Sequence, residues 1–311
     1  MNKIIVIVGP TAVGKTHISV ELAKKLGTEI ISADSMQIYK GMDIGTAKVT
    51  EDEKQGIIHH MIDIVSPDED YSVSEFKYTA EKIIDRLLEE KKVPVIVGGS
   101  GLYVNSLIYD LDFGNARSDE KLREYYTYYY KKHGEDALYD KLLKIDPEAA
   151  EKIHKKNVKR VIRALEVYDI TGSKFSEINT DIRKESNKYD CILAGLSMER
   201  KVLYERINQR VDEMLSKGLL EEVRSLMEKG YGKNLVSMRG IGYKEIIDHL
   251  EGITDYDEAA DILKRNTRRF AKRQYTWFLK DRNVKWFSMD NPADVDNTIN
   301  NILNYVRIRL N

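Results

Sequence analysis

The feature that most constrains the fold is a glycine-rich segment near the start of the chain, Gly9-Pro10-Thr11-Ala12-Val13-Gly14-Lys15-Thr16. It fits the pattern G-x-x-x-x-G-K-[ST] of a phosphate-binding loop. A β-branched apolar run at 4–8 precedes it, and apolar residues at helical spacing follow it in 16–26. Such a loop turns backbone N–H groups toward a phosphate chain at the N-terminus of a helix, where the helix dipole adds positive charge. The sequence therefore predicts a phosphate site, with Lys15 as a mobile cation and Thr16 as a hydroxyl ligand for Mg²⁺.

The first third of the chain alternates strand and helix patterns. Residues 28–32 have the pattern of a second strand, and 93–97 have that of another, buried strand, which leads into Gly98-Gly99-Ser100-Gly101. Between these runs, Ser72 and Glu75 have the spacing of a capping box at the start of an amphipathic helix. Strand, helix and strand in this order predict an α/β fold, a P-loop NTPase-like parallel sheet core flanked by helices.

The middle of the chain, about 116–190, has no strand pattern and is helical in character. We interpret it as a helical insertion domain within an α/β core that comprises 1–115 and 191–311. The pattern after the insertion predicts a strand at 191–196, followed by two helical stretches at about 200–229 and about 256–281.

A tyrosine cluster is the unusual feature of the insertion: Tyr125, Tyr126, Tyr128, Tyr129 and Tyr130. The cluster is compatible with helix packing that leaves ring tips in solvent, and also with a platform on which nucleic-acid bases stack. Helix packing is the commoner role of tyrosines on a helix and is the interpretation that we favour.

Composition and charge exclude several classes of protein. Lys and Arg total 50 against 51 Asp and Glu, so no global basic field draws the chain to nucleic acid. One cysteine, Cys191, excludes an internal disulfide framework and a cysteine-based zinc site. No apolar run approaches the length of a membrane span, so we expect no membrane partner and a cytoplasmic location. Any affinity for nucleic acid must come from local patches, of which 152–163 has six basic residues and no acid, and 264–285 has nine against one.

Asp34 is the acid that a parallel sheet would place beside the phosphate loop, because it follows the apolar pair Ile30 and Ile31. A carboxylate there can help to hold a metal ion or act as a general base. An Asp between Ala33 and Ser35 is equally suited to cap a helix. The residues themselves leave these alternatives open.

The segment around Asp34 carries a resemblance to a known family. Residues 31–48, ISADSMQIYKGMDIGTAK, follow the phosphate loop and closely resemble the tRNA dimethylallyltransferases, also called isopentenyltransferases. Further matching segments occur in the same order along the chain, at 59–63, 98–103, 159–167, 209–214, 238–243 and 267–278. A phosphate loop alone would not be specific, whereas these segments in this order are.

The resemblance implies transfer of a dimethylallyl group from dimethylallyl diphosphate to the exocyclic amine of the adenine on the 3′ side of a tRNA anticodon. The loop would then hold the diphosphate as a leaving group, with Mg²⁺ on Thr16. Asp34 would take the proton of the attacking amine, which weakens its interpretation as a helix cap. Because an adenine stacked in an anticodon loop cannot reach such a site, the base would flip into a channel. The family also implies a monomer.

The resemblance implies a set of binding residues, each carried over at a matching position. Arg210 is a candidate ligand of the diphosphate, beside the residues of the phosphate loop. The tRNA anticodon stem-loop would contact Asp34, Ser35, Met36, Gln37, Ser100, Arg123, Lys159, Arg160, Val161, Ile162, Arg163, Arg239, Arg273 and Gln274. Ser100 stands where relatives commonly have Thr and keeps the hydroxyl.

The basic stretch after residue 256 forms two neighbouring rows on a predicted helix: Lys264, Arg268 and Lys272, and Arg265, Arg269 and Arg273. The rows suit RNA phosphates, but a solvated face whose charges complement the helix dipole explains the composition equally well. The family resemblance favours contact with RNA or diphosphate for Arg273 and Gln274.

Two rival functions share the same motifs. A nucleotide kinase would use the phosphate loop for ATP and the helical insertion as a lid. A non-catalytic RNA-binding protein would use the basic patches alone. The histidines include no pair at metal-ligand helical spacing, and we interpret His59 and His60 as structural.

Overall fold

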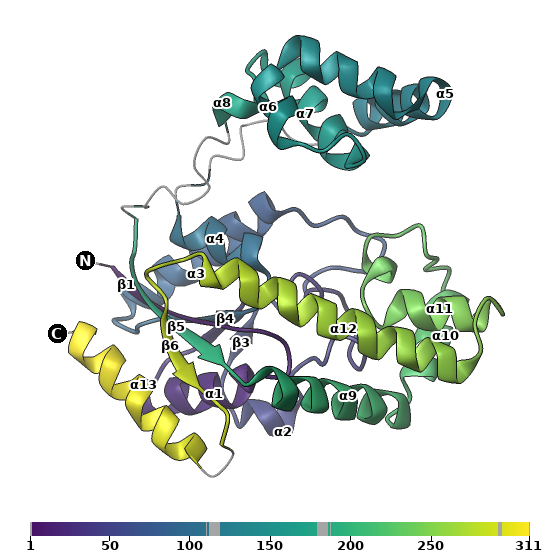
Figure 1. Ribbon diagram of the computed structural model, residues 1–311. Coiled ribbons are helices and arrows are strands. Elements are labelled where there is room, and N and C mark those ends of the chain that lie inside the picture. The colour runs from purple at the N-terminus through teal and green to yellow at the C-terminus, as the bar shows by residue number, and fades with distance from the viewer. Residues whose placement is uncertain are drawn as a thin grey trace. The chain divides into compact units, whose positions relative to one another are not determined.

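The computed structural model describes residues 2–109, 111, 119–178, 186, 188–291 and 294–310. The chain divides into two compact units (Figure 1). The P-loop unit comprises Met1–Ile108 and Asn187–Asn311, and the helical unit comprises Tyr109–Ser186. The boundaries that the sequence suggested, at 116 and 190, lie near or within residues outside the described ranges, so that division stays a prediction.

Within the described residues, the P-loop unit contains one sheet of six parallel strands in the order β3-β2-β4-β1-β5-β6. Its strands are β1 (Lys3–Val8), β2 (Ile30–Ser32), β3 (His59–His60), β4 (Val95–Gly98), β5 (Asp190–Ser197) and β6 (Lys285–Ser288). This confirms the predicted α/β fold with a parallel sheet. The sequence did not predict β3 and β6, which are short edge strands without a fully buried apolar run.

The helices of this unit are α1 (Lys15–Leu26), α2 (Glu51–Lys54), α3 (Val73–Glu89), α4 (Gly101–Ile108), α9 (Arg200–Ser216), α10 (Leu219–Glu228), α11 (Tyr243–Leu250), α12 (Tyr256–Leu279) and α13 (Val295–Leu310), with a 3₁₀ turn η1 (Ser237–Arg239). The capping box of Ser72 and Glu75 starts α3 as predicted. The helical stretch predicted at about 200–229 is confirmed, and Gly218 in the left-handed region divides it into α9 and α10. Among the described residues, no helix has the length and apolarity needed to cross a bilayer.

The main core lies between the sheet and the helices α1 and α13. Ile5 and Ile7 of β1 are fully buried, and Ile18 of α1 and Ile302 of α13 belong to the same apolar cluster. Figure 1 shows α3 and α4 on the opposite face of the sheet. With both faces covered, β1 is a continuous apolar run, as parallel sheets require.

A second apolar core packs the segment that follows β2 against the helices α10 and α11. Met42 packs in one cluster with Val223 of α10 and Ile246 of α11. The Glu222 carboxylate accepts hydrogen bonds from the backbone N–H groups of Asp43, Ile44 and Gly45, at 2.9, 2.7 and 3.0 Å. The Tyr243 hydroxyl donates to the same carboxylate at 2.7 Å. One acidic side chain therefore fixes the turn that follows Asp34 and its neighbours.

The helical unit contains α5 (Glu120–Ile145), α6 (Pro147–Lys152), α7 (Val158–Thr171) and α8 (Phe175–Ile178). Gly134, with φ of 83°, divides α5 into two arms. Tyr126 is buried in the core of the unit, whereas Tyr125 and Tyr128 are 53% and 64% exposed. The tyrosine cluster therefore packs in part and leaves rings in solvent in part.

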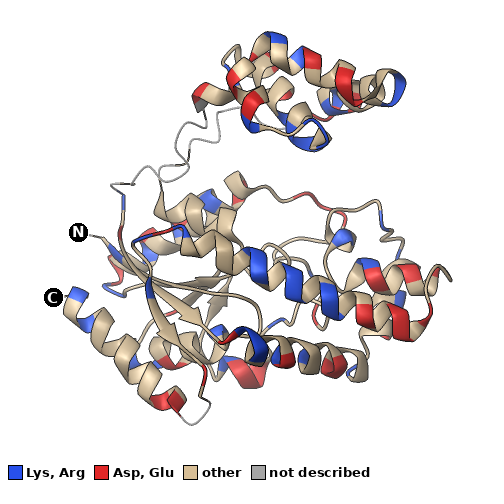
Figure 2. Ribbon diagram, in the orientation of Figure 1, with Lys and Arg blue, Asp and Glu red and all other residues tan. Residues whose placement is uncertain are grey.

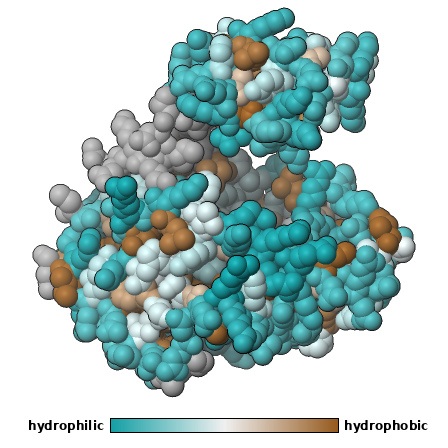
Figure 3. Space-filling view, in the orientation of Figure 1, coloured by the Kyte–Doolittle hydropathy of each residue, from teal (hydrophilic) through white to brown (hydrophobic). Residues whose placement is uncertain are grey.

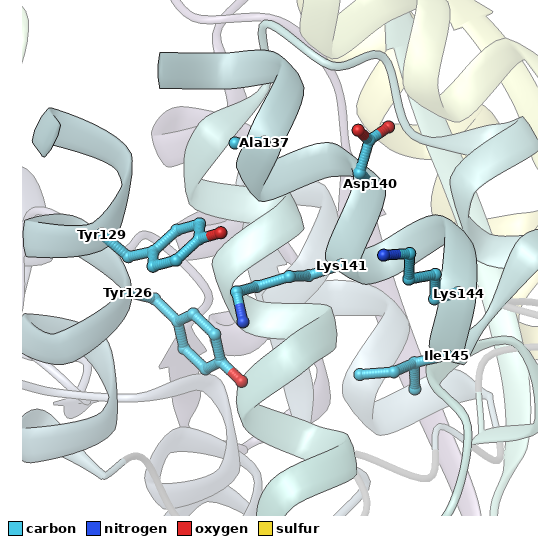
Figure 4. A pocket seen from close by; sticks show the side chains of 7 residues that line it. All are labelled: Tyr126, Tyr129, Ala137, Asp140, Lys141, Lys144 and Ile145. Carbon is cyan, nitrogen blue, oxygen red and sulfur yellow. The ribbon is translucent and has the colours of Figure 1, made fainter. Parts of the chain in front are cut away.

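Between the arms of α5 lies a pocket of about 410 Å³ (Figure 4). Its wall combines tyrosine rings, two lysines and an acid: Tyr126, Tyr129, Ala137, Asp140, Lys141, Lys144 and Ile145. The Lys141 ammonium lies 4.5 Å from the centroid of the Tyr129 ring. All seven residues belong to α5, so the pocket contains none of the residues of the phosphate loop.

Glu222→Ala should lower the free energy of unfolding of the P-loop unit by about 2 kcal/mol, because it leaves the part-buried N–H groups of Ile44 and Gly45 without their acceptor. Urea denaturation followed by tryptophan fluorescence measures this, since Trp277 and Trp286 both lie in this unit. Glu221→Ala, at the exposed neighbouring position, is the matched control and should change stability by less than about 0.5 kcal/mol. Equal stability of the two variants would show that Glu222 does not anchor the turn.

Candidate active site

The phosphate loop connects β1 to α1 at the carboxyl end of the sheet. Gly14, with φ of 104°, precedes α1, and no side chain caps that helix within the described structure. The first N–H groups of α1 therefore lack intrahelical partners and remain available to an anion. Ala12 also has a positive φ, 66°, so the loop curls tightly between the two glycines of the motif.

Lys15 lies over the loop that it follows. Its ammonium donates to the carbonyl oxygens of Gly9 and Pro10 at 3.0 and 2.8 Å. Burial lowers the pKa of Lys15 from 10.5 to about 8; the Asp34 carboxylate opposes this shift and the Arg210 guanidinium adds to it. The Lys15, Asp34 and Arg210 charges therefore interact in one site, although the last two are 176 positions apart in the sequence.

Arg210 reaches the phosphate loop from α9. Its guanidinium Nη1 donates to the Thr11 hydroxyl at 3.4 Å. Burial lowers the pKa of Arg210, with Glu53 and Glu213 opposing the shift. The structure thus brings Arg210 to the phosphate loop, where a diphosphate ligand requires a second cation.

Gln274 of α12 joins the phosphate loop to the glycine run after β4. Its side-chain oxygen accepts from the Thr11 N–H at 2.8 Å, and its Nε2 donates to the Gly99 carbonyl at 3.1 Å. A Cβ at Gly99 would collide with the Gln274 amide, and one at Gly101 would collide with the Trp277 indole. The glycine run therefore lets α12 approach the loops, and Gln274 acts on the site by holding them.

Asp34 follows β2, the strand next to β4, and its carboxylate lies in a turn. Asp34 Oδ1 accepts from the Met36 N–H at 2.9 Å, and the chain continues in a turn with no α-helix. The helix-cap interpretation is therefore wrong. Among the described residues, nothing donates a hydrogen bond to Oδ2. One oxygen thus orients the carboxylate, and the other is available to a ligand.

The neighbours of Asp34 hold its turn in place. The Ser35 N–H donates to the Ser100 hydroxyl at 3.0 Å, and this hydroxyl donates to the Ser35 hydroxyl at 3.2 Å. The Gln37 side chain is used internally, since Nε2 donates to the Ala47 carbonyl at 3.2 Å and Oε1 accepts from Ser32. Met36 packs against Gly240, where a Cβ would come within 2.5 Å of its methyl carbon.

Arg239 and Arg273 are both exposed on the P-loop unit. Arg239 Nε donates to the Lys233 carbonyl at 3.1 Å, and Arg239 directly precedes Gly240, which contacts Met36. The Arg273 guanidinium lies 5.8 Å from the centroid of the Phe270 ring, on the helix that contains Gln274. Both guanidiniums can therefore meet a partner from solvent.

The remaining predicted contacts lie in the helical unit, and they differ in exposure. Lys159 and Arg160 are exposed at the start of α7, whereas Val161 and Ile162 are 0% and 7% exposed in the core of the unit. The matched segment is a helix with one face in solvent and one face in the core of the unit. Val161 and Ile162 lie on the buried face, so their side chains are not accessible to RNA.

Arg123 and Arg163 share one buried carboxylate. Glu166 has a side-chain exposure of 0%, and it accepts from Arg123 Nε at 2.8 Å and from Arg163 Nη1 at 2.7 Å. The Asp119 N–H donates to the same carboxylate at 2.8 Å. The two arginines are therefore held in fixed positions inside their unit.

The two histidines that we interpreted as structural, His59 and His60, both have partners within the protein. His60 Nε2 lies 2.6 Å from Glu29 Oε2, and Arg86 and Lys92 also pair with Glu29. Burial raises the pKa of Glu29, but hydrogen bonds from His60, Arg86 and Lys92 lower it to about 2. His59 Nδ1 lies 2.9 Å from the Ile57 carbonyl oxygen. These contacts support the structural interpretation of both residues.

A metal ion at this site would depend on few protein ligands. Thr16 is exposed at the start of α1, and its hydroxyl is a hard oxygen donor of the kind that Mg²⁺ accepts. Among the described residues, no group of three or more His, Cys, Asp and Glu side chains could hold a metal. The residues thus fit a Mg²⁺ ion bound chiefly by phosphate oxygens and water, with Thr16 as a protein ligand.

Three residues near the site were not singled out from the sequence. Glu222 and Tyr243 anchor the turn at 43–45, and a Cβ at Gly45 would come within 2.6 Å of the Tyr243 ring. Tyr103 is 6% exposed and stacks on Phe76, with ring centroids 4.1 Å apart. Burial raises the pKa of Tyr103, and the Asp34 carboxylate contributes to the rise. No local pattern reveals these roles, because each depends on a distant partner.

Comparison with known proteins gives one consistent family. A family model described as IPP transferase matches residues 37–282. The tRNA dimethylallyltransferase of Alkaliphilus oremlandii is 52% identical over 302 residues, which cover 97% of this chain and 96% of that protein.

Solved structures agree with this result. The crystal structure of the full-length tRNA isopentenylpyrophosphate transferase of Bacillus halodurans has a TM-score of 0.76 and 47% identity, and the match covers 100% of this chain and 97% of that one. A eukaryotic dimethylallyltransferase acting on tRNA has a TM-score of 0.81 and 31% identity, with 95% and 76% covered. The resemblance of residues 31–48 is thereby confirmed, and the chain belongs to the IPP transferase family.

Proposed function

We propose that the protein transfers a dimethylallyl group from dimethylallyl diphosphate to the exocyclic amine of the adenine on the 3′ side of a tRNA anticodon, with release of diphosphate. The observation that supports this function best is the carboxylate of Asp34, which interacts with Lys15 of the phosphate loop. One of its oxygens has no hydrogen-bond partner among the residues that the structure describes. A transferase of this kind needs a diphosphate cradle and a proton acceptor next to each other.

The phosphate loop binds the diphosphate of the substrate. The free N–H groups at the start of α1, the Lys15 ammonium and the Arg210 guanidinium surround its oxygens. Negative charge on the diphosphate grows as the allylic carbon–oxygen bond breaks, so donors fixed before the reaction stabilise the transition state. A Mg²⁺ ion held with Thr16 would neutralise part of the same charge.

Asp34 accepts the proton that the adenine must lose. The amine nitrogen forms a bond to the allylic carbon while the bond from that carbon to the diphosphate oxygen breaks, and the proton moves from nitrogen to Asp34 Oδ2. The hydrogen bond from the Met36 N–H to Oδ1 keeps the carboxylate oriented for this transfer. The hydrogen bond from the Ser35 N–H to the Ser100 hydroxyl holds the same turn in place.

The anticodon stem-loop of tRNA is the second substrate. Exposed cations on both units, Lys159 and Arg160 on α7 and Arg239 and Arg273 on the P-loop unit, support contacts with its phosphates. The hydroxyls of Ser35 and Ser100 lie beside Asp34, where the flipped adenine must enter. One chain supplies both the phosphate loop and Asp34, which is compatible with a monomer. We expect the protein to work in the cytoplasm, where tRNA is found.

Asp34→Asn should lower turnover by about 10²–10⁴-fold, because the amide retains an acceptor for the Met36 N–H but cannot take a proton. The assay measures incorporation of labelled dimethylallyl diphosphate into unmodified tRNA with Mg²⁺, and tRNA affinity should stay at the wild-type value. Asp68→Asn, at an exposed position of the same unit, is the control and should keep full turnover.

The same assay separates the rival functions. Unchanged turnover in Asp34→Asn would remove Asp34 as the base. Wild-type protein that incorporates no label but phosphorylates a nucleotide with ATP would be a kinase. Tight tRNA binding with neither activity would indicate a non-catalytic RNA-binding protein.

Diphosphate affinity should fall as pH rises through about 8, because Lys15 has a pKa of about 8 and is a cation only below that value. Titration of inorganic diphosphate between about pH 6.5 and 9.5 measures this. Lys15→Met, which removes the ammonium and keeps the length of the side chain, should bind more weakly throughout and lose this component of the pH dependence. Identical pH profiles of the two proteins would contradict the role of Lys15.

Lys159→Ala should weaken tRNA binding and reduce the slope of log affinity against log salt by about 0.7–0.9, the value for one phosphate contact. The KM for dimethylallyl diphosphate should not change. Lys152→Ala is the matched control, since Lys152 lies in the same unit and pairs with Glu148 at 2.8 Å. A Lys159 variant that altered only diphosphate affinity would place this residue at the other substrate.

A further inference from the structure

The carboxylate of Glu166, on α7, is enclosed by the protein, and protein donors occupy both of its oxygens. Arg123 of α5 binds it side-on, with Nε at 2.8 Å from Oε1 and Nη2 at 3.3 Å from Oε2. Arg163 Nη1 donates to Oε2 at 2.7 Å, and the Asp119 N–H donates to Oε1 at 2.8 Å. A carboxylate has about four acceptor positions. Glu166 therefore has no position left for a substrate, and any part that it takes in binding must act through its partners.

The two arginines reach solvent although they share a buried partner. The Arg123 side chain is 46% exposed and that of Arg163 is 30% exposed, whereas that of Glu166 is 0% exposed. The side-on pair uses the edge of Arg123 that contains Nε and Nη2, so Glu166 does not occupy Nη1. Arg123 thus has a donor that this carboxylate does not use, on a side chain that is fixed from inside the unit.

Stability alone does not require two arginines at this carboxylate. One cation neutralises a buried carboxylate, and an ion pair with a half-exposed partner adds little to the stability of a fold. The two guanidiniums also repel each other, because both lie against the same two oxygens. An arginine that is already ordered loses less conformational freedom when it binds a ligand. A fixed pair of arginines therefore suits the binding of an anion better than it suits packing.

The surface of the helical unit is polar but mixed in charge. Figure 3 shows mostly hydrophilic residues on the visible face of this unit, and Figure 2 shows Lys and Arg interspersed with Asp and Glu along its helices. Salt screens exposed charges beyond about 8 Å at physiological ionic strength. Affinity for a polyanion here therefore depends on where individual guanidiniums are held, and less on the total charge of the unit.

We propose that Glu166 is a positioning residue for tRNA: it holds the Arg123 guanidinium in the orientation in which it binds a phosphate group of the RNA backbone, with the charge of Arg163 fixed beside it. This inference rests on the proposed function and adds to it a residue that touches neither substrate. The ligand is a phosphate group because a guanidinium binds phosphate through paired N–H donors, as Arg123 already binds the carboxylate.

Glu166→Gln separates positioning from attraction by total charge. The substitution removes one negative charge from the unit, so total charge alone would strengthen the binding of tRNA. The amide has nearly the size of the carboxylate, but its NH₂ group faces donors and cannot accept from them. At least one arginine is then released, so positioning predicts weaker binding, a change of the opposite sign.

The test measures the affinity of E166Q for an unmodified tRNA transcript, together with kcat at saturating tRNA, the KM for dimethylallyl diphosphate and thermal unfolding. E148Q is the matched control, because Glu148 is exposed in the same unit and loses the same charge. S176A controls for stability, because it removes a buried hydrogen bond, from the Ser176 hydroxyl to Asp146 at 2.7 Å, away from the arginines. The E166Q variant should bind tRNA about 3- to 15-fold more weakly than the wild type, with kcat and KM unchanged. Neither control should bind tRNA more weakly than the wild type.

A double-mutant cycle tests whether Glu166 acts through Arg123. R123Q leaves Arg163 to neutralise Glu166 and should bind tRNA more weakly than the wild type. Adding E166Q to R123Q should weaken binding further by less than about 2-fold, because the side chain that Glu166 orients is already gone. An equal loss from E166Q in both backgrounds would assign Glu166 to the fold alone and overturn the proposal. So would R123Q with wild-type affinity, or E166Q that binds tRNA as tightly as E148Q.

E166D decides the matter if E166Q does not fold. It keeps the charge but withdraws it by one methylene from the guanidiniums, so the folded variant should also bind tRNA more weakly than the wild type. Folded E166D with wild-type affinity for tRNA would overturn the proposal.

The outcome also separates this inference from the function on which it rests. A wild-type protein that transfers the dimethylallyl group while E166Q retains full tRNA affinity overturns the inference alone. A wild-type protein that neither binds tRNA nor transfers the group overturns the proposed function, and this inference with it.

Discussion

The side-chain amide of Gln274 joins two loops that leave neighbouring strands of the sheet. Through it, the Thr11 N–H of the loop after β1 and the Gly99 carbonyl of the loop after β4 are held by one residue of α12. A loop with a free backbone has many conformations, and ordering each residue costs about 1–2 kcal/mol. The phosphate loop is therefore organised before any ligand arrives, but only in a chain whose last third has already packed against its first.

The charged side chains near this bridge do not balance, because cations outnumber carboxylates. Lys15 and Arg210 contribute two cations, and Asp34 contributes one carboxylate. Burial lowers the pKa of Lys15 to about 8 despite the nearby carboxylate, so desolvation exceeds that attraction. Under the proposed function, a diphosphate would supply further negative charge, which would stabilise both cations and leave Asp34 for the second substrate. Such a site favours a multiply charged anion over a neutral or singly charged ligand.

The sequence predicted the parts of the fold that depend on local patterns. The phosphate loop, the parallel core and the capping box of Ser72 and Glu75 each have a short signature, and the structure contains all three. It did not reveal α11, α13 or the edge strands β3 and β6, whose pattern is short or mixed. The role of Glu222 could not be predicted from a local pattern, because its partners at 43–45 are about 180 residues away in the sequence.

The site residues divide in the same way. Asp34 could be placed beside the phosphate loop from strand order alone, whereas Arg210 and Gln274 came only from the family resemblance, because their proximity to Thr11 depends on tertiary packing. The resemblance also carried over Val161 and Ile162, which the structure buries. A match to a helical segment assigns the same role to all of its residues, but packing determines which of their side chains face solvent.

The depth of a cation determines which substrate it can serve. Lys15 and Arg210 are half-buried, so under the proposed function their attraction for a phosphate would be stronger and less affected by salt than that of a fully exposed cation. Cations on the surface, such as Lys159 and those of α12, act through water and counterions, and salt weakens them steeply. A small diphosphate must be held firmly while its bond breaks, whereas a tRNA must bind, align one base and leave. Half-buried charge for the first substrate and exposed charge for the second would fit these opposite requirements.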